Sequence, residues 1–450
     1  MEVTSAVAIT ARRSDIPVAT RFEWLPKDWD VAKIGELFDI RQGKSLSRRE
    51  QTGKRKKRFL RTANVLWGRL DLSEVDEMDF TPDECSALAL TRGDLLVCEG
   101  GDIGRTAVWR GELSDCYYQN HLHRLRAIAR NANPFFMMHW MHAAVVYLRL
   151  YEGTGNKTTI PNLSRSRLSE FDVALPPLPE QRKIAAVLWK VQDAIATEDA
   201  IVRNARDLKK SLLRRLFSRG VRDEPLKDTP YGEAPKDWDI QPLSECAYVQ
   251  TGVAKGRPID PSLAVEIPYL RVANVQAGHL DLSEIKNIQI RRDELERYSL
   301  HRDDVVVTEG GDFDKLGRGF IWDSQIEPCV HQNHIFAVRP HRDRLSPRYF
   351  AYLIQSPYGR GYFLAVAHKT TNLACINTNK LKAFPVLIPP FPDQERIASA
   401  LQTVDEKIAV HEAKQRDLQD LFKTLLHQLM TAQIRVNRLD IDTSKVAISR

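Results

Sequence analysis

Three short motifs in the chain resemble sites for phosphate, methyl-transfer or nuclease chemistry. The segment Gly43-Lys44-Ser45 matches the end of a phosphate-binding P-loop, but Phe38 occupies the position of the first required glycine, so the phosphate-cradling turn is not encoded. The segment Ile388-Pro389-Pro390-Phe391 resembles an adenine-methyltransferase motif. Its first residue is Ile instead of the Asn or Asp that must hydrogen-bond the target amine, and no glycine-rich cofactor motif precedes it. Neither motif predicts catalysis.

The third motif is an incomplete nuclease set, formed by Pro258, Asp260, Glu284 and Lys286. Ile259 separates the proline from the aspartate, which such sites place side by side. The 6 cysteines are far apart and have neither a CxxC pair nor histidines at zinc-ligand spacing. The sequence therefore predicts no catalytic residue, no metal site and no disulfide framework.

Length and charge limit the class of protein. A chain of 450 residues exceeds one ordinary hydrophobic core, so we expect two or more domains. The net charge of +7 favours an anionic partner such as nucleic acid. The apolar stretch at residues 6–9 is too short for a secretory signal, and no apolar run could span a bilayer. We expect a soluble, cytoplasmic protein with no membrane partner.

An internal repeat organises the elements that would position any site. Pro26-Lys27-Asp28-Trp29-Asp30 recurs at 235–239. Further matches follow in the same order: 61–65 with 271–275, 70–74 with 280–284, 99–102 with 309–312, 119–121 with 332–334, and 176–177 with 389–390. The offset between matched residues is nearly constant and close to half the chain, which indicates a duplicated domain instead of a solenoid.

Each copy has the same predicted plan. Short β-rich runs and a helical stretch precede a proline-rich joint, which suits the first turn of a helix. After each joint, apolar residues alternate three and four apart, from Ile184 to Leu216 through Leu208 and from Ile397 to Leu429 through Leu421. This spacing predicts two coiled-coil helices.

The predicted fold class is α+β, with two tandem α/β-type domains joined by two long helices. The predicted boundaries are 22–175 for domain 1, 176–218 for helix 1, 219–235 for a linker, 236–388 for domain 2 and 389–433 for helix 2. Because helix 1 leaves domain 1 and ends where domain 2 begins, the helices must be antiparallel if they pair. We therefore expect an antiparallel coiled coil with pseudo-two-fold symmetry, the symmetry needed to read two separated half-sites on a duplex.

The joint carries a family resemblance. Leu-Pro-Pro-Leu-Pro-Glu-Gln at 175–181 opens a long helix after a domain of this size, and the pattern returns at 388–394 with Ile, Phe and Asp substituted. Gly43-Lys44-Ser45, the Gly-Asp-Leu-Leu strand at 93–96 and the Lys-Thr-Thr segments at 157–159 and 369–371 fit the same pattern. Over roughly residues 22–433 the chain resembles the specificity subunits of type I restriction-modification systems.

The resemblance implies that each domain is a target-recognition domain that reads half of a bipartite target on double-stranded DNA. It also implies that the helices bind two modification (methyltransferase) subunits, and that restriction (motor-nuclease) subunits can join them. S-adenosylmethionine, ATP and Mg would then belong to the partners, with no cofactor on this chain. The subunit interface would include both joints, at Pro177, Pro179, Glu180, Gln181, Pro390, Pro392, Asp393 and Gln394.

The candidate DNA contacts are basic residues in predicted loops. Residues 41–61 hold ten Lys or Arg and one acid, which is consistent with phosphate contact or with a solvated loop. The candidates there are Lys44, Lys54, Arg55, Lys56, Lys57 and Arg58, and the second copy offers only Lys255 and Arg257. Lys157, Thr158, Lys369 and Thr370 are candidates for phosphate or base-edge contacts, with simple turn chemistry as the alternative.

Motifs that recur unchanged are predicted to be structural. Two domains that read different half-sites should differ where they touch bases, so Gln119-Asn120-His121 and its copy favour a shared structural role. The Glu-Gly-Gly-Asp segments at 99–102 and 309–312 predict a tight turn with positive φ. Two other functions remain open: a coiled-coil assembly scaffold without sequence-selective DNA binding, and the recognition half of a related restriction enzyme whose catalysis lies on another chain.

Overall fold

Each copy of the repeat folds around its own core. The computed structural model describes residues 22–45, 56–151, 162–311, 316–369 and 374–447. The chain divides into unit 1, formed by residues 1–198 and 414–450, and unit 2, formed by residues 199–413. Among the described residues, no helix combines the length and apolar character needed to cross a membrane.

Unit 1 contains two small sheets. The first is antiparallel, with strand order β2 (Phe38–Gln42), β10 (Leu122–Ala127), β7 (Leu95–Cys98) and β8 (Thr106–Val108). In the second, β3 (Lys56–Leu60) lies between antiparallel β6 (Asp76–Asp79) and parallel β9 (Cys116–Tyr118). Two-stranded pairs complete the set: β1 (Asp30–Lys33) with β11 (Asp172–Leu175), and β4 (Val65–Leu66) with β5 (Arg69–Leu70).

Unit 2 repeats this topology. Its four-stranded sheet has the order β15 (Ala247–Thr251), β24 (Ile335–Pro340), β20 (Val305–Thr308) and β22 (Gly319–Ile321), and its three-stranded sheet has β16 (Ala264–Leu270) between β19 (Lys286–Arg291) and β23 (Val330–His331). β14 (Asp239–Pro242) pairs with β27 (Pro385–Ile388), and β17 (Val275–Gln276) pairs with β18 (His279–Leu280). The predicted mixed α and β domain is therefore present twice.

Short helices cover these sheets. In unit 1 they are α2 (Ile34–Leu37), α4 (Pro82–Leu88), α5 (Pro134–His142) and α6 (Arg165–Ser169). In unit 2 they are α8 (Leu243–Cys246), α9 (Leu295–Tyr298), α10 (Pro347–Leu353), α11 (Pro357–Val366) and α12 (Thr378–Lys382). The helical stretches predicted in both copies thus form α5 in unit 1 and α10 with α11 in unit 2. In each unit the four-stranded sheet and most of these helices share one large apolar core. The three-stranded sheet packs in smaller apolar clusters, together with α4 in unit 1 and α9 in unit 2.

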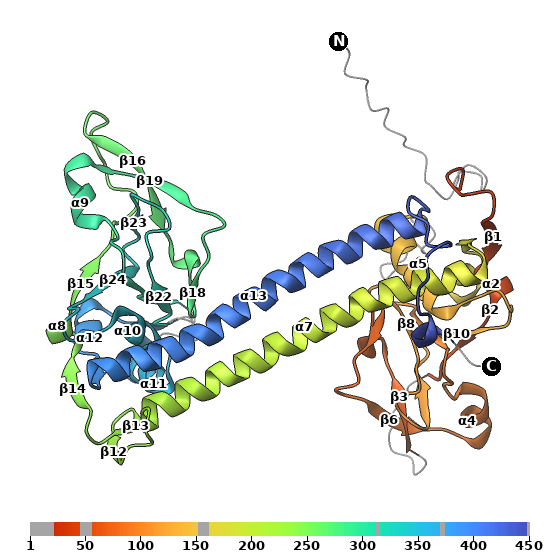
Figure 1. Ribbon diagram of the computed structural model, residues 1–450, viewed down its shortest axis with the longest axis horizontal. Helices are drawn as coiled ribbons and strands as arrows, with labels where there is room; N and C mark the ends of the chain where they lie inside the picture. The colour runs from red at the N-terminus through yellow and green to blue at the C-terminus, as the bar shows by residue number, and fades with distance from the viewer. Residues whose placement is uncertain (1–21, 46–55, 152–161, 312–315, 370–373, 448–450) are drawn as a thin grey trace. The chain divides into compact units, whose positions relative to one another are not determined.

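The two joints open long helices, α7 (Leu178–Arg219) and α13 (Phe391–Met430), as the proline-then-apolar pattern predicts (Figure 1). In unit 1 the buried side chains of Ile184 and Leu188 share a core with Phe422 and Leu426. Lys414 Nζ also lies 2.7 Å from Glu198 Oε1, so α7 and α13 run in opposite directions within this unit.

In unit 2 the helix contacts are partly polar. Lys209 Nζ lies 2.7 Å from Asp405 Oδ1, and Arg206 Nη2 lies 2.6 Å from Glu412 Oε1. Leu208, which the apolar spacing places on the seam, is 51% exposed. The prediction that Leu208 packs in an apolar seam is therefore wrong. At this level of the helices the ion pair between Lys209 and Asp405 makes the contact instead.

The segment predicted as a linker contains secondary structure. β12 (Leu226–Thr229) and β13 (Gly232–Pro235) form an antiparallel hairpin. Ala234 is fully buried in the core of unit 2, and Tyr231 packs its ring against Tyr362 with centroids 5.1 Å apart. Residues 226–235 therefore belong to the folded unit, because apolar side chains of the hairpin complete its core.

Candidate nucleic-acid interface

The glutamine of each joint anchors a long helix to its domain. Gln181 accepts a hydrogen bond from the backbone N–H of Asn133 at 2.9 Å and donates to the carbonyl oxygens of Asn131 and Pro176. Gln394 makes the same contacts in the second copy, with the N–H of Ser346 and the carbonyls of Arg344 and Pro389. Both glutamines are buried, so their amides hold the helix start and are not exposed to a partner.

The acidic residue of each joint is also internal. Glu180 is 2% exposed and accepts from Arg435 Nε at 2.6 Å and Nη2 at 2.7 Å, while Trp29 Nε1 donates to it at 3.3 Å. Asp393 is 2% exposed and accepts from both Nη atoms of Arg222, at 3.0 and 3.1 Å. Each arginine follows the C-terminal end of a long helix and binds the start of the other one within the same unit.

These contacts correct the predicted interface at four residues. Glu180, Gln181, Asp393 and Gln394 are buried by this chain, because their charges and amides are satisfied internally. The prolines of the joints behave differently. Pro177, Pro179, Pro390 and Pro392 are exposed, and Phe391 between the last two is 41% exposed. The part of the joint that remains open to a partner is therefore its apolar proline face.

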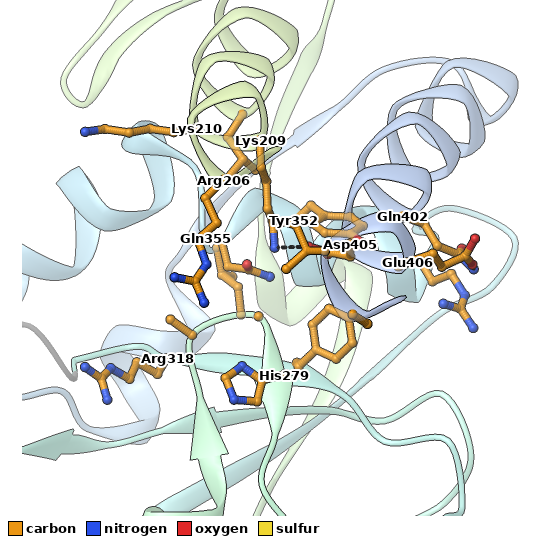
Figure 2. Close-up of a pocket in the computed structure, with 18 of the residues that line it drawn as sticks. Arg206, Lys209, Lys210, His279, Arg318, Tyr352, Gln355, Gln402, Asp405 and Glu406 are labelled. Carbon is orange, nitrogen blue, oxygen red and sulfur yellow. Dashed lines mark hydrogen bonds and ion pairs between the residues drawn. The ribbon is translucent and has the colours of Figure 1, made fainter. Parts of the chain in front are cut away.

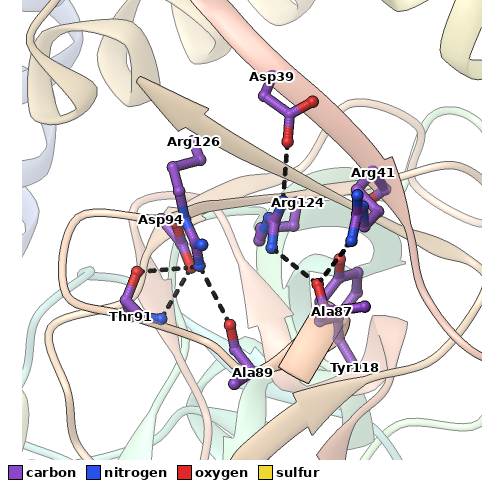
Figure 3. A network of polar contacts seen from close by, with 9 residues as sticks. All are labelled: Asp39, Arg41, Ala87, Ala89, Thr91, Asp94, Tyr118, Arg124 and Arg126. Atoms are coloured by element: carbon purple, nitrogen blue, oxygen red, sulfur yellow. Dashed lines mark hydrogen bonds and ion pairs between the residues drawn. The ribbon is translucent and has the colours of Figure 1, made fainter. Parts of the chain in front are cut away.

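A buried aspartate recurs directly before one strand of each four-stranded sheet, at Asp94 before β7 and at Asp304 before β20. Asp94 is 1% exposed and is held by the Nε and Nη2 atoms of Arg126, each at 2.7 Å, as Figure 3 shows. Arg339 holds the buried Asp304 of unit 2 in the same way, at 2.7 and 2.8 Å. The hydrogen bond to Asp94 raises the pKa of Arg126, so the guanidinium stays charged. This aspartate supports the sheet and is unsuited to contact DNA.

A recurring asparagine has a similar structural task. Asn64 accepts a hydrogen bond from the N–H of Arg61 and donates to the carbonyls of Asp71 and Glu74. Asn274 repeats all three contacts in unit 2, with Arg271, Asp281 and Glu284. The matched segments at 61–65 and 70–74 therefore recur together, because the asparagine of the first segment hydrogen-bonds to backbone carbonyls of the second.

The recurring glycine segments have the predicted positive φ, but in unit 2 the two glycines form a strand instead of the predicted tight turn. Gly101 has φ +72° and Gly311 has φ +147°, a region that favours glycine. Gly310 also pairs with Cys375 between strands β21 (Gly310–Gly311) and β26 (Ala374–Cys375). A Cβ on Gly310 would lie 2.5 Å from the carbonyl oxygen of Ala374, so this strand contact requires glycine.

Lys44 is engaged within unit 1. Its side chain is 9% exposed, and Nζ lies 2.7 Å from both Glu84 Oε2 and the carbonyl oxygen of Asp79. The ammonium also lies 5.2 Å from the centre of the Phe80 ring. Lys44 therefore ties the segment after β2 to α4, and its predicted DNA contact stays a prediction that would require this ion pair to break.

The basic run of the first copy lies partly on a strand. Lys56, Lys57 and Arg58 belong to β3, so their prediction as a loop is wrong. Lys56 and Arg58 are exposed and alternate with Lys57, whose Nζ lies 3.1 Å from Asp115 Oδ2. Strand alternation thus places Lys56 and Arg58 on one face. Lys54 and Arg55 lie outside the described residues.

The second copy offers less positive charge. Lys255 is exposed in the turn after β15. Arg257 instead makes two hydrogen bonds to the carboxylate of Glu294, at 2.7 and 2.9 Å, and this contact raises the pKa of Arg257. Its predicted phosphate contact stays a prediction, and the guanidinium would have to share or leave Glu294 to make it.

The remaining candidates are only partly described. Lys369 belongs to the two-residue strand β25 (His368–Lys369), which pairs with β26. Lys157, Thr158 and Thr370 lie outside the described residues. Within the residues that the structure describes, no group of three or more His, Cys, Asp or Glu side chains has the geometry of a metal site.

Sequence patterns alone did not identify Arg222 and Arg435, or Arg126 and Arg339. The members of each pair are related by the same offset that aligns Gln181 with Gln394. An arginine and an acidic residue that both recur at this offset could have predicted an internal ion pair. The recurrence of the arginine alone could not.

Two α+β domains, each held to a long helix by the same buried contacts, define a duplicated two-domain protein whose exposed candidate cations lie on β3 and in the turn after β15. Comparison with known families identifies this arrangement. Residues 26–203 and 235–420 match the type I restriction modification DNA specificity domain, and the chain belongs to this family.

The chain is similar to several named relatives. It is 24% identical over 437 residues to the type I restriction enzyme MjaIX specificity subunit of Methanocaldococcus jannaschii, covering 92% of this chain and 95% of that protein. It is 21% identical to the EcoKI specificity subunit of Escherichia coli K12, covering 93% and 92%. A 23% identical match to the putative MjaX specificity subunit of M. jannaschii spans 49% of that protein.

A solved structure has a similar fold. The S subunit of a type I restriction-modification system from M. genitalium superposes with a TM-score of 0.54 at 15% identity, covering 90% of this chain and 98% of the other. This likeness supports the two-domain architecture.

Proposed function

We propose that this chain is the DNA-recognition subunit of a type I restriction-modification complex. Two DNA specificity domains in one chain, each with its own core, carry this proposal. Each domain, at 22–175 and 236–388, would read one half of a bipartite target on double-stranded DNA. Separate cores make the two readings independent, because one domain can change without repacking the other.

The long helices, at 176–218 and 389–433, would form an antiparallel coiled coil with pseudo-two-fold symmetry. The identical contacts of Gln181 and Gln394 support this arrangement, since both copies fasten their helix start in the same way. The exposed proline faces would then dock two modification subunits, one per copy, at Pro177 with Pro179 and at Pro390 with Pro392. Restriction subunits would join through that complex.

Catalysis would belong to the partners. S-adenosylmethionine would bind the modification subunits, and ATP and Mg would bind the restriction subunits, with no cofactor on this chain. The incomplete methyltransferase motif supports this division, since Ile388 cannot accept a hydrogen bond from an adenine amine through its side chain. Here Ile388 instead ends strand β27, where it pairs with Asp239.

The DNA contacts would include Lys56 and Arg58 on β3 and Lys255 in unit 2, because these cations are exposed. Lys54, Arg55, Lys157, Thr158, Lys369 and Thr370 remain predicted contacts. Exposed cations on rigid strands place positive charge at fixed positions, which orients a duplex without reading its sequence.

Methylome sequencing of cells with and without this chain tests the function. Loss of a bipartite adenine motif in the deletion strain, and its return with the gene, is the expected result. An unchanged methylome in a host that expresses the modification subunit would contradict the proposal and favour an assembly scaffold. As a second measurement, the purified chain should transfer no methyl group from S-adenosylmethionine unless the modification subunit is added.

A further inference from the structure

The two copies differ at the tip of one hairpin. In unit 1 the tip between β4 and β5 carries Gly68 at φ +75°, and in unit 2 the tip between β17 and β18 carries Gly278 at φ +81°. A Cβ on Gly68 would lie 2.2 Å from Gln192 Nε2 of α7. A Cβ on Gly278 would lie 3.0 Å from Lys209 Nζ of α7. Both tips therefore approach a long helix of their own unit.

In unit 1 aromatic side chains fill the space beside this tip. Trp67 stacks on His142 with ring centroids 4.6 Å apart, and His142 lies 5.9 Å from the ring of Phe422 on α13. The guanidinium of Arg110 lies over the rings of Phe135 and Trp189, at 5.0 and 5.5 Å. This part of unit 1 is thus packed by rings.

Unit 2 lacks those rings. Ala277 replaces Trp67 at the offset that aligns Asn64 with Asn274, and Gln355 replaces His142 at the offset that aligns the two joint glutamines. The same offset relates the two long helices: Lys209 of α7 corresponds to Phe422 of α13. A cavity of about 870 Å³, lined by Ala277, Gln355 and Lys209 among others, lies here. Its volume falls in the range of roughly 300–1,000 Å³ typical of small-molecule sites.

Several charges in this cavity are paired: Lys209 with Asp405, Arg206 with Glu412 and Arg348 with Asp323. Figure 2 shows Arg206, Lys210 and Arg318 on one side of the ion pair between Lys209 and Asp405, with Gln402 and Glu406 on the other. In all, six Lys or Arg and four acids line the cavity. Among the described lining residues the cations therefore outnumber the acids, which favours an anionic ligand.

Ring surfaces adjoin the charged groups. Phe320 and Tyr352 line the same cavity, and the Tyr352 hydroxyl donates to Asp405 at 2.8 Å, which fixes that ring. Tyr352 is 2% exposed and the Lys209 ammonium lies over its ring, so the half-buried Phe320 is the ring of this pair that offers a face to a ligand. Aromatic faces beside a cationic group are suited to a ligand that joins a planar ring to an anion.

We propose that the unit 2 cavity binds a nucleotide, with its phosphate near Arg206, Lys210 and Arg318 and its base against the aromatic side. The nucleotide is either free in solution or one unit of a bound DNA strand, since both present the same phosphate and base chemistry. The free-nucleotide form does not depend on the proposed recognition function.

Calorimetric titration of the full chain with ATP tests the free form without DNA. The Ala277→Trp variant restores the indole of unit 1 and should weaken ATP binding more than tenfold by filling the cavity. Arg206→Gln and Lys210→Gln should each weaken it about tenfold by removing a charge-assisted contact. Arg214→Gln is the matched control, because Arg214 lies on α7 and does not line the cavity. Thermal unfolding confirms that each variant remains folded.

Titration with a mixed-sequence DNA duplex at several salt concentrations tests the second form. Arg206→Gln and Lys210→Gln should each reduce the log-log salt slope by about 0.9 if a backbone phosphate occupies the site. Ala277→Trp should also weaken DNA binding. ATP binding that Ala277→Trp abolishes identifies a free nucleotide, and a DNA effect alone identifies a nucleotide of the duplex. The proposal is overturned if Ala277→Trp, while folded, changes neither titration. Because recognition is judged separately by the methylome, failure here leaves that test independent.

Discussion

Arg435 joins the C-terminal segment to the start of α7, and its replacement by Met should selectively destabilise unit 1. The substitution keeps most of the aliphatic stem but removes both bonds to Glu180, whose carboxylate is 2% exposed. Of the side-chain hydrogen bonds to the Glu180 carboxylate among the described residues, the one from the Trp29 indole at 3.3 Å would then remain. Breaking a buried ion pair by removing one partner costs about 3–5 kcal/mol. Since the Arg435 side chain is 25% exposed, we expect about 3 kcal/mol.

The contact with Arg435 also lowers the pKa of Asp28, and the bonds to Glu180 and Asp28 raise the pKa of Arg435 itself. The charged pair therefore persists at neutral pH. For a unit of this size, a loss of about 3 kcal/mol corresponds to a fall in melting temperature of roughly 6–12 °C. Two units need not unfold together, so hydrogen exchange of peptides from each unit is the better measurement.

Peptides from α5 and the N-terminal turn of α7 should exchange faster in Arg435→Met, whereas peptides from α10 should not change. Arg222→Met is the matched control, because it removes the equivalent arginine from Asp393 in unit 2. Its effect should be smaller and confined to unit 2, since the Arg222 side chain is 61% exposed. A double variant, Arg435→Met with Glu180→Gln, should recover part of the stability by removing the buried charge. Equal protection of α5 in Arg435→Met and in the original chain would refute this reasoning.

Three further outcomes are expected. Lys56→Gln with Arg58→Gln should lower the salt slope of DNA binding by about 1.8 if each contacts one phosphate, and an unchanged slope would remove β3 from the interface. Burial lowers the pKa of His139 to about 3 and of His142 to about 4, from an ordinary value near 6.5. Their contribution to stability is complete above pH 6.5 and is lost as the pH falls toward 4, because the unfolded chain binds the protons first. His139→Leu should reduce this pH dependence by about one proton in denaturant titrations, and an identical dependence would contradict the assignment. Exchange of residues 22–175 with the domain of a related subunit should change one half-site by methylome sequencing, and a change in both would contradict separate recognition.

The fold was largely predictable from the sequence, because the two copies of the duplicated domain can be aligned with each other. Matches at one offset identified the two domains, and proline followed by apolar periodicity predicted α7 and α13. The error at Leu208 has a physical cause. Periodicity marks an apolar position, but the neighbouring Lys209 finds Asp405, and an ion pair between facing helices cannot be read from spacing alone.

The candidate site was less predictable, because charge says nothing about internal partners. Lys44 and Arg257 were chosen as free cations, yet Glu84 and Glu294 lie 40 and 37 residues away in sequence and bind them in the fold. The same limit applies to the joint. Glu180 looks like a surface acid at a helix start, and only the fold shows that Arg435 returns to cover it.

Buried residues that recur in both copies stabilise the fold, whereas exposed strand residues differ between the copies. Asn64 and Asn274 bind equivalent backbone groups in both copies, so they stabilise the same fold and cannot distinguish two half-sites. The exposed strand positions do differ. At the offset that aligns these two asparagines, Lys56 of β3 corresponds to Glu266 of β16, so one face carries a cation in unit 1 and an anion in unit 2. We expect Lys56 to favour the approach of DNA phosphates to this strand in unit 1, and Glu266 to oppose it in unit 2. If both domains bind DNA as proposed, we therefore expect them to contact it through different surfaces, although the scaffold beneath those surfaces is the same.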